Sequence, residues 1–234
     1  MKVIGLLGGM GWESSAEYYR IINREVRAQL GGQHSAECIL YSLDFHEIKA
    51  MQHQNRWEDL TQILKEAAQN LQSAGADLLL LCTNTMHLVA PQVQQAIDIP
   101  LIHIVDTTAR DIKRRNMKQV GLLGTRFTME EEFYRSRLSE IHHISAIVPD
   151  KGQREIVHRI IYDELTNEEI REESRTQVVD IIESLVNEGG EGVILGCTEL
   201  PMLIRSEDVS VPVLNTTLLH AQEAVAISIE ELFE

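Results

Sequence analysis

The sequence predicts an α/β protein made of two pseudo-symmetric lobes, each a mostly parallel sheet flanked by helices. Short, nearly continuous runs of Val, Ile and Leu alternate with longer amphipathic stretches, which is typical of parallel strands covered on both faces. The chain also repeats itself at about half its length. Its 234 residues suit one large unit or two small lobes, and either can bury a sizeable core.

Each expected element follows from its local pattern. The predicted strands are the apolar runs Val3–Leu7, Glu37–Ser42, Ala76–Cys82, Leu101–Ile104, Gln119–Leu123, Gly192–Leu195 and Val211–Leu214. The predicted helices are the amphipathic stretches Ser15–Leu30, Trp57–Ala74, Thr128–Ile141 and Asn167–Glu188. For the last of these, capping residues and acids at 166–169 predict the start, and Gly189-Gly190 predicts the end.

Three echoes, in the same order, indicate the repeat. Residues 4–9 recur at 120–125, residues 79–85 recur at 193–199, and residues 99–102 recur at 211–214, so the offset stays between 112 and 116 residues. We therefore expect a first lobe over residues 1–104 and a second over 105–215. We expect the C-terminal helix, 216–234, to pack back on the first lobe. A ligand is then expected in the cleft between the lobes, where the carboxyl ends of both sheets can face it.

Composition narrows the class of function. The formal net charge is −15, and such a field repels phosphate backbones and anionic membrane surfaces, so we expect no nucleic acid and no membrane as partner. Three scattered cysteines fit a reducing compartment, and we expect a cytoplasmic protein. The histidines lack zinc-site spacing, so no metal is expected.

The repeat places Thr83 and Cys197 at equivalent positions, each just past a buried strand. Asn84 and Thr85 follow in one half, and Thr198 and Glu199 follow in the other. Two proton carriers on opposite faces of one carbon are what a racemase needs, because one removes the α-proton and the other returns a proton to the far face.

Three motifs carry a resemblance to a known family. The segments 81–87 (LCTNTMH), 196–199 (GCTE) and 5–10 (GLLGGM) resemble the cofactor-independent aspartate/glutamate racemases, along the whole chain and in the expected order. The resemblance implies two α/β lobes with a cleft between them, a homodimer, no pyridoxal phosphate, and catalysis by one thiol from each lobe.

This chain departs from the family in its first motif, which usually reads Cys-Asn-Thr and here reads Thr83-Asn84-Thr85. Cys82 comes one position early, and successive strand residues point to opposite faces, so we expect Cys82 to be a buried apolar residue. Because a thiol is a far stronger acid than a hydroxyl, we predict Cys197 as the thiolate base and Thr83 as the proton donor on the opposite face. The resemblance further implies L-aspartate and L-glutamate as the preferred substrates.

Other residues are predicted to bind the amino-acid substrate. The resemblance points to Gln52, where other members often place arginine, and to Glu164, where some aspartate-specific members carry a basic side chain. Gly8–Gly11 is expected to let the backbone approach the substrate. Thr125 can hold a carboxylate or merely cap a helix. The substrate-binding set is Met10, Gln52, Asn84, Thr85, Thr125, Glu164 and Thr198.

Two rival functions stay open from the sequence. A related single-thiol decarboxylase or isomerase would use Cys197 alone, and a sensor would bind an amino acid without turning it over. His87 and His220 recur near strand ends, where either a helper role or a place in the polar core is compatible with the pattern.

Overall fold

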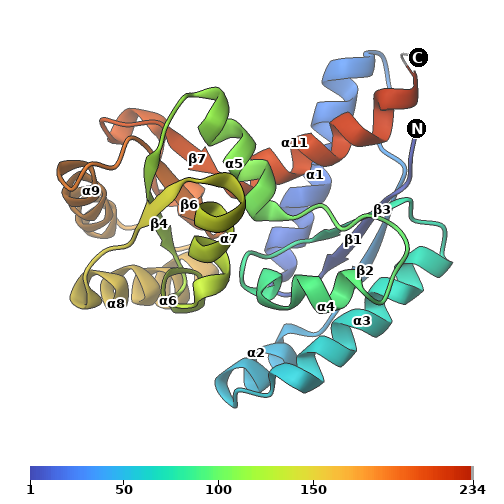
Figure 1. Cartoon of the computed structure of the whole chain (residues 1–234), viewed down its shortest axis with the longest axis horizontal. Coiled ribbons are helices and arrows are strands. Elements are labelled where there is room, and N and C mark those ends of the chain that lie inside the picture. The colour runs from blue at the N-terminus through green and yellow to red at the C-terminus, as the bar shows by residue number, and fades with distance from the viewer. Residues whose placement is uncertain (233–234) are drawn as a thin grey trace. The chain divides into compact units, whose positions relative to one another are not determined.

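Two separate parallel sheets organise the chain in the computed structural model, which describes residues 1–232 (Figure 1). The chain divides into unit 1, Met1–Ile104 with His220–Glu234, and unit 2, Val105–Leu219. Each unit has an α/β fold with helices flanking its sheet. Residues 233–234 of the expected C-terminal helix lie outside the described residues.

The sheet of unit 1 has the order β2-β1-β3. Its strands are β1 (Ile4–Gly8), β2 (Cys38–Ser42) and β3 (Leu78–Leu81), all parallel. The expected strand Leu101–Ile104 is wrong as a strand, because only Leu101 pairs, in a single parallel bridge to Leu79, and Ile104 already begins a helix.

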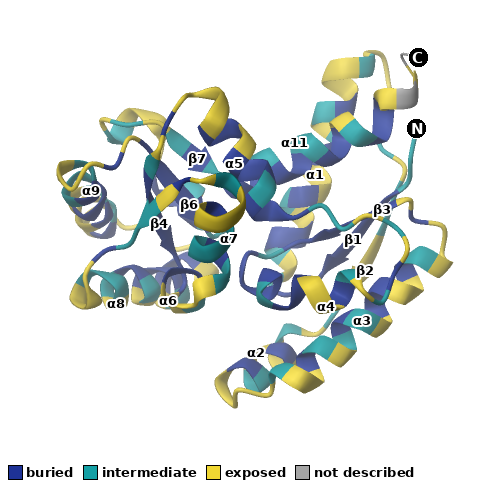
Figure 2. Cartoon of the chain, viewed as in Figure 1, coloured by how far each residue is buried: buried dark blue, intermediate teal, exposed yellow. Residues whose placement is uncertain are grey.

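Alternate side chains of these strands enter two cores. Ile4, Leu6 and Leu80 lie on the face covered by α1 (Trp12–Leu30) and by the part of α11 (Thr216–Ile229) that belongs to unit 1. Leu7 and Leu79 lie on the other face. The helices there are α2 (Phe45–His53), α3 (Trp57–Ser73) and α4 (Ala90–Gln94), which follows the 3-10 helix η1 (Thr85–Val89). Buried strands between helices with exposed outer faces are visible in Figure 2.

The sheet of unit 2 has the order β5-β4-β6-β7. Its strands are β4 (Gln119–Gly124), β5 (Ser145–Ile147), β6 (Val193–Gly196) and β7 (Val213–Asn215). The sequence did not predict β5, because this edge strand is short and only partly buried, so it lacks a continuous apolar run.

Helices on one face of this sheet share a core with Leu123, Val193 and Leu195. They are α6 (Arg126–Glu130), α8 (Lys151–Arg159), the π-helical turn η2 (Ile160–Glu164), the 3-10 turn η3 (Leu165–Asn167), α9 (Glu172–Asn187) and α10 (Leu200–Leu203). The remaining 3-10 turns are η4 (Ser206–Asp208), in this unit, and η5 (Glu230–Leu232), in unit 1.

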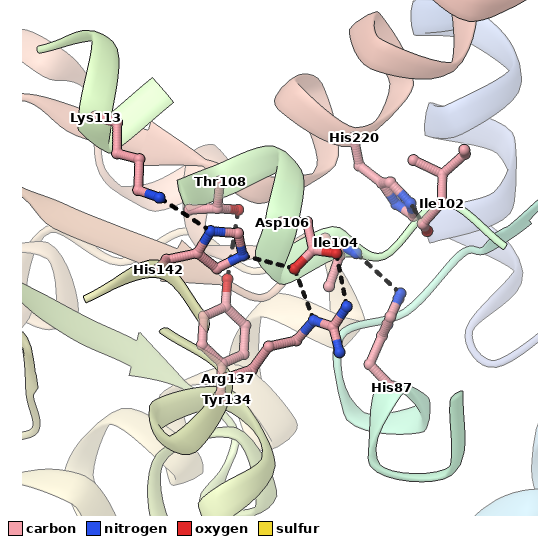
Figure 3. Close-up of polar contacts among 10 residues, drawn as sticks. All are labelled: His87, Ile102, Ile104, Asp106, Thr108, Lys113, Tyr134, Arg137, His142 and His220. Atoms are coloured by element: carbon pink, nitrogen blue, oxygen red, sulfur yellow. Dashed lines mark hydrogen bonds and ion pairs between the residues drawn. The ribbon is translucent and has the colours of Figure 1, made fainter. Parts of the chain in front are cut away.

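Helix α5 (Ile104–Arg114) and helix α7 (Glu132–His142) are joined by a charged cluster. Both nitrogens Nε and Nη2 of Arg137 donate to Asp106 at 2.7 Å, and His142 Nε2 lies 2.8 Å from the same carboxylate. Figure 3 shows Asp106 between Arg137 and His142.

Two predicted helices are interrupted or shortened in the structure. The stretch Thr128–Ile141 is divided into α6 and α7, because Glu131 has an extended backbone (ψ 145°). The stretch Asn167–Glu188 becomes α-helical only at Glu172, because Glu168 adopts a left-handed conformation (φ 59°) that an α-helix does not continue through.

Within each unit the repeated segments occupy the same place in the sheet. β1 and β4 each have a strand on both sides, and the repeated segments β3 and β6 pair directly with them. The third echo falls at the Leu79–Leu101 bridge in unit 1 and at β7, beside β6, in unit 2. In the described part of the chain, no helix is both long and apolar enough to cross a bilayer.

Candidate functional site

In unit 1 the candidate residues follow the strands at the carboxyl edge of the sheet. Met10 follows β1 and Thr83 follows β3, while Gln52 lies on α2, the helix after β2. The amide of Cys82 donates to the carbonyl of Leu7 at 2.9 Å, so the pairing of β1 and β3 continues up to the start of both loops. Parallel neighbouring strands thus bring the loops of Met10 and Thr83 to one edge of the sheet.

These candidates differ in how far their side chains are buried. Met10 is 6% exposed and belongs to the core cluster that contains Leu7 and Ile48, so it packs as an apolar residue. Gln52 and Asn84 are also buried, whereas Thr83 is partly exposed. Within the described residues, the hydroxyl of Thr83 has no hydrogen-bond partner. The hydroxyl of Thr83 is therefore available for an added molecule.

The glycine turn after β1 is shaped by packing within unit 1. Gly9 has φ +82°, and a Cβ placed there would collide with the backbone of Leu43, while a Cβ at Gly8 would collide with Ser15. Ser15 Oγ accepts the Gly9 amide at 2.8 Å. The glycines of this turn therefore make room for Ser15 and for the backbone of Leu43. The expected approach of this backbone to the substrate stays a prediction.

In unit 2 the candidates follow two neighbouring strands. Thr125 follows β4 and Cys197 follows β6, directly after the paired residues Gly124 and Gly196. Thr125 is buried, and its hydroxyl lies 3.4 Å from the hydroxyl of Thr128. The strand pairing therefore brings Thr125 and Cys197 to the same carboxyl edge of this sheet.

The Cys197 thiol contacts a carboxylate two residues further along the chain. Cys197 Sγ donates to Glu199 Oε2 at 2.6 Å, and the hydroxyl of Thr198 donates to the same oxygen at 3.0 Å. Burial, together with the charge and the hydrogen bond of Glu199, raises the pKa of the Cys197 thiol well above its ordinary value.

The sequence left the protonation state of Cys197 open, and this environment favours the protonated thiol over the thiolate. A helix N-terminus can lower a thiol pKa, but α10 has only the four residues Leu200–Leu203, and a carboxylate stands beside the sulfur. The raised pKa favours the protonated thiol, and Glu199 is placed to receive its proton. Sequence reasoning noted Glu199 as a polar neighbour and missed this role. The signal was a glutamate directly after Cys197-Thr198.

Tyr162 and Glu164 lie on the π-helical turn η2. Burial and the nearby Cys197 and Glu199 raise the pKa of Tyr162 to about 12, so its phenol stays protonated at neutral pH. Glu164 is 9% exposed, accepts a hydrogen bond from Ser174 Oγ at 2.6 Å, and has Arg171 Nη1 at 3.7 Å. Both carboxylate oxygens of Glu164 therefore already have partners in unit 2.

Cys82 is fully buried in the core of unit 1, and burial raises the pKa of its thiol. Its predicted role as a buried apolar residue is confirmed. Across residues 1–232, no group of three or more His, Cys, Asp or Glu side chains is arranged to hold a metal ion.

Comparison with known proteins adds three relatives. A family model described as Asp/Glu/Hydantoin racemase matches residues 7–224. A broad specificity amino-acid racemase, RacX, from Bacillus subtilis (strain 168) is 21% identical over 96% of this chain and 97% of its own. A provisionally assigned Asp/Glu racemase from Yersinia pestis has a solved structure with TM-score 0.93 and 50% identity, over 98% of this chain and 100% of that one. An aspartate racemase homologue from Pyrococcus horikoshii OT3 has TM-score 0.85 and 36% identity, over 97% and 99% of the two chains.

Proposed function

Because the chain belongs to the Asp/Glu/Hydantoin racemase family, we propose that it racemises amino acids by proton transfer at Cα, with Cys197 and Thr83 as the two acid–base groups. The observation that carries the proposal is the hydrogen bond from the Cys197 thiol to the Glu199 carboxylate, at the carboxyl edge of β6. A thiol with an adjacent base is an activated acid–base group, whereas a buried thiol without one is inert.

The proposed reaction begins with the thiol protonated. Glu199 takes the proton from Cys197 Sγ, and the thiolate then removes the α-proton of an L-amino acid, which leaves a carbanion and regenerates the thiol. The hydroxyl of Thr83 protonates the opposite face and recovers its own proton from solvent. Glu199 releases to solvent the proton that it took from Cys197, which restores the starting state of the enzyme. A hydroxyl suits this second step because a carbanion is strongly basic, whereas a threonine hydroxyl is too weak an acid to serve as a resting base.

The proposed substrates are L-aspartate and L-glutamate, with other amino acids open. The name of one relative, an aspartate racemase homologue, supports an acidic substrate. The name of another, a broad specificity amino-acid racemase, supports the acceptance of other amino acids. Gln52 is neutral, and Glu164 is acidic and already paired, so neither offers a cation to a second carboxylate. Met10, Asn84, Thr85, Thr125 and Thr198 complete the proposed substrate-binding set. The net charge of −15 makes capture of an anion depend on such local amides and hydroxyls.

Three further features belong to the same proposal. The two acid–base groups act without pyridoxal phosphate, the protein is a homodimer, and it works in the cytoplasm, where its three free thiols stay reduced.

Incubation with L-aspartate or L-glutamate in deuterated water tests the proposal. We expect the D-enantiomer to form with deuterium at Cα, and Cys197→Ser to lower both exchange and inversion by at least about 100-fold. Cys38→Ser is the matched control, because Cys38 lies on β2 in unit 1, and we expect it to leave both rates unchanged. Since two enantiomers have equal free energy in water, kcat/KM must come out equal in the two directions.

Other outcomes would favour the rivals. Consumption of a substrate with full activity in Thr83→Ala would indicate a single-thiol decarboxylase or isomerase. Calorimetric binding of an amino acid with no isotope exchange would indicate a sensor. Neither exchange nor loss of optical rotation with any amino acid of a full L and D panel would overturn the racemase.

A further inference from the structure

His87 is a buried histidine on η1, four residues after Thr83, and it is 1% exposed. Its Nδ1 lies 2.9 Å from the carbonyl oxygen of Thr83, and the amide of Ile104 donates to its Nε2 at 3.2 Å. A carbonyl can only accept a hydrogen bond and an amide N–H can only donate one, so Nδ1 carries the proton and Nε2 does not. The two contacts together require the neutral ring in one tautomer.

The same residue also holds the turn through its backbone. The amide of His87 donates to the carbonyl of Asn84 at 3.1 Å. The carbonyls of Thr83 and Asn84 therefore both accept hydrogen bonds from His87, one from its ring and one from its backbone. The hydroxyl of Thr83 has no hydrogen bond of its own to the described residues. The direction of that hydroxyl is therefore set by the backbone at Thr83, which the imidazole fixes.

The ring of His87 is itself held on its other sides. The ring of His103 packs edge-on at 4.7 Å and that of His220 at 5.6 Å between centroids. His220 is anchored in turn, because its Nε2 lies 2.7 Å from the carbonyl of Ile102 and its Nδ1 lies 2.7 Å from the hydroxyl of Tyr18. Figure 3 shows His87 reaching Ile104 and His220 reaching Ile102, on the segment that leads into α5.

From this geometry we propose that His87 is a positioning residue for racemisation, which holds the Thr83 hydroxyl where it exchanges a proton with Cα. The inference rests on the proposed function and assigns His87 no contact with substrate. Its imidazole acts on the carbonyl of Thr83, and the bond to Ile104 keeps the ring in the tautomer that can donate to that carbonyl.

The position of Thr83 decides on which face the carbanion is protonated. When Thr83 is held correctly, the carbanion is protonated on the far face and the amino acid inverts. When Thr83 is displaced, the carbanion waits longer, and Cys197 returns a solvent-derived deuteron to the original face. L-aspartate then gains deuterium at Cα without inverting, so the ratio of inversion to exchange with retention falls. A loss of folded protein lowers both rates equally and leaves that ratio unchanged.

Two substitutions at one position separate the two ring contacts. In His87→Asn the amide nitrogen can occupy the place of Nδ1 and donate to Thr83, while the Ile104 contact is lost. In His87→Gln the amide oxygen can occupy the place of Nε2 and accept from Ile104, while the Thr83 contact is lost. The two variants each remove one buried hydrogen bond, so they form a matched pair for stability.

The experiment follows L-aspartate in deuterated water by chiral separation and mass spectrometry of the remaining L and newly formed D molecules. We expect the inversion-to-retention ratio to fall at least about tenfold in His87→Gln and in Thr83→Ala, and to stay within about twofold of wild type in His87→Asn. Thermal unfolding of both His87 variants accompanies the assay.

Different results overturn different claims. A wild type that neither exchanges nor inverts any amino acid overturns the proposed function, and the role of His87 with it. An active wild type with the same ratio in His87→Gln as in His87→Asn overturns only the role of His87, whether both ratios fall or neither does. An unchanged ratio in Thr83→Ala removes Thr83 as the donor, and His87 then has nothing to position.

Discussion

At the scale of single residues, the contact between Cys197 and Glu199 sets the starting point of the chemistry. A carboxylate 2.6 Å from the sulfur stabilises the thiol and destabilises the thiolate, so the same residue that can accept the proton also raises the pKa of its donor. In the proposed mechanism, Glu199 takes the proton of this thiol before the thiolate acts as the base. The proposed activity and the reactivity of the free thiol should therefore respond in opposite directions when Glu199 loses its charge.

We expect Glu199→Gln to make Cys197 more reactive and the enzyme less active. Removing the carboxylate lowers the thiol pKa and increases the thiolate fraction, so alkylation of Cys197 by iodoacetamide at pH 8 should be faster by about tenfold. Racemisation should fall by about tenfold or more, because the proton acceptor is gone. Peptide mass spectrometry gives the alkylation rate of each cysteine, and Cys38 in the same sample is the internal control. An alkylation rate at Cys197 equal to or below wild type would contradict the role assigned to Glu199.

At the scale of elements, the turn after β1 is packed more closely against neighbouring backbone than its sequence indicates. The turn after β1 requires Gly9 because a positive φ coincides with close approach of the Leu43 backbone. At Gly32 the chain uses glycine for conformation alone. Gly32 has φ +57°, and a Cβ added there would have no atom within 4 Å. The two positions separate backbone strain from steric collision.

Gly9→Ala should destabilise the protein much more than Gly32→Ala. The second change adds only the strain of an L-residue at positive φ, about 1 kcal/mol, while the first adds a collision with backbone that cannot move aside, for a total of about 3 kcal/mol. Urea unfolding followed by circular dichroism measures both. Equal midpoints for the two variants would show that the Leu43 backbone yields without resistance.

At the scale of the whole molecule, several buried or partly buried acids bind their protons more tightly in the folded protein than in an unfolded chain. Burial raises the pKa of Cys82 and of Tyr134, and burial with nearby charges raises those of Cys197 and Tyr162. Unfolded thiols ionise near pH 8.5 and unfolded tyrosines near pH 10. The unfolded chain therefore binds fewer protons than the folded one above about pH 8.5, and the free energy of unfolding must fall as pH rises.

Cys82→Ala isolates one of these groups. The variant loses a constant amount of stability to the smaller side chain, but it also loses the pH dependence that Cys82 contributes. Between about pH 8.5 and 10 we expect the free energy of unfolding of wild type to fall more steeply than that of the variant, by up to about 1.4 kcal/mol per pH unit. Urea unfolding at a series of pH values measures the two slopes. Identical slopes would mean that the Cys82 thiol ionises in the folded state.

Much of the architecture could be predicted, because buried parallel strands appear in the sequence as short, continuous apolar runs. Six of the seven expected runs contain a strand, and the repeated motifs occupy equivalent positions in the two sheets. The seventh run, Leu101–Ile104, reduces to one bridge, since the start of a helix competes for the same residues. The edge strand β5 could not be predicted, because Ser145–Ile147 is too short for a periodic signal.

By itself, the sequence determined the α/β class, the repeat, and the two strand ends that carry Thr83 and Cys197. Those features depend on local patterns and on the order of motifs. Only the tertiary structure decided how these residues are held and that a carboxylate lies beside the Cys197 thiol. The partners of Glu199 and His87 are matters of side-chain direction and loop packing, and the Ile104 amide lies 17 residues from the ring that accepts it. Such contacts follow from the folded backbone, and no periodicity along the chain encodes them.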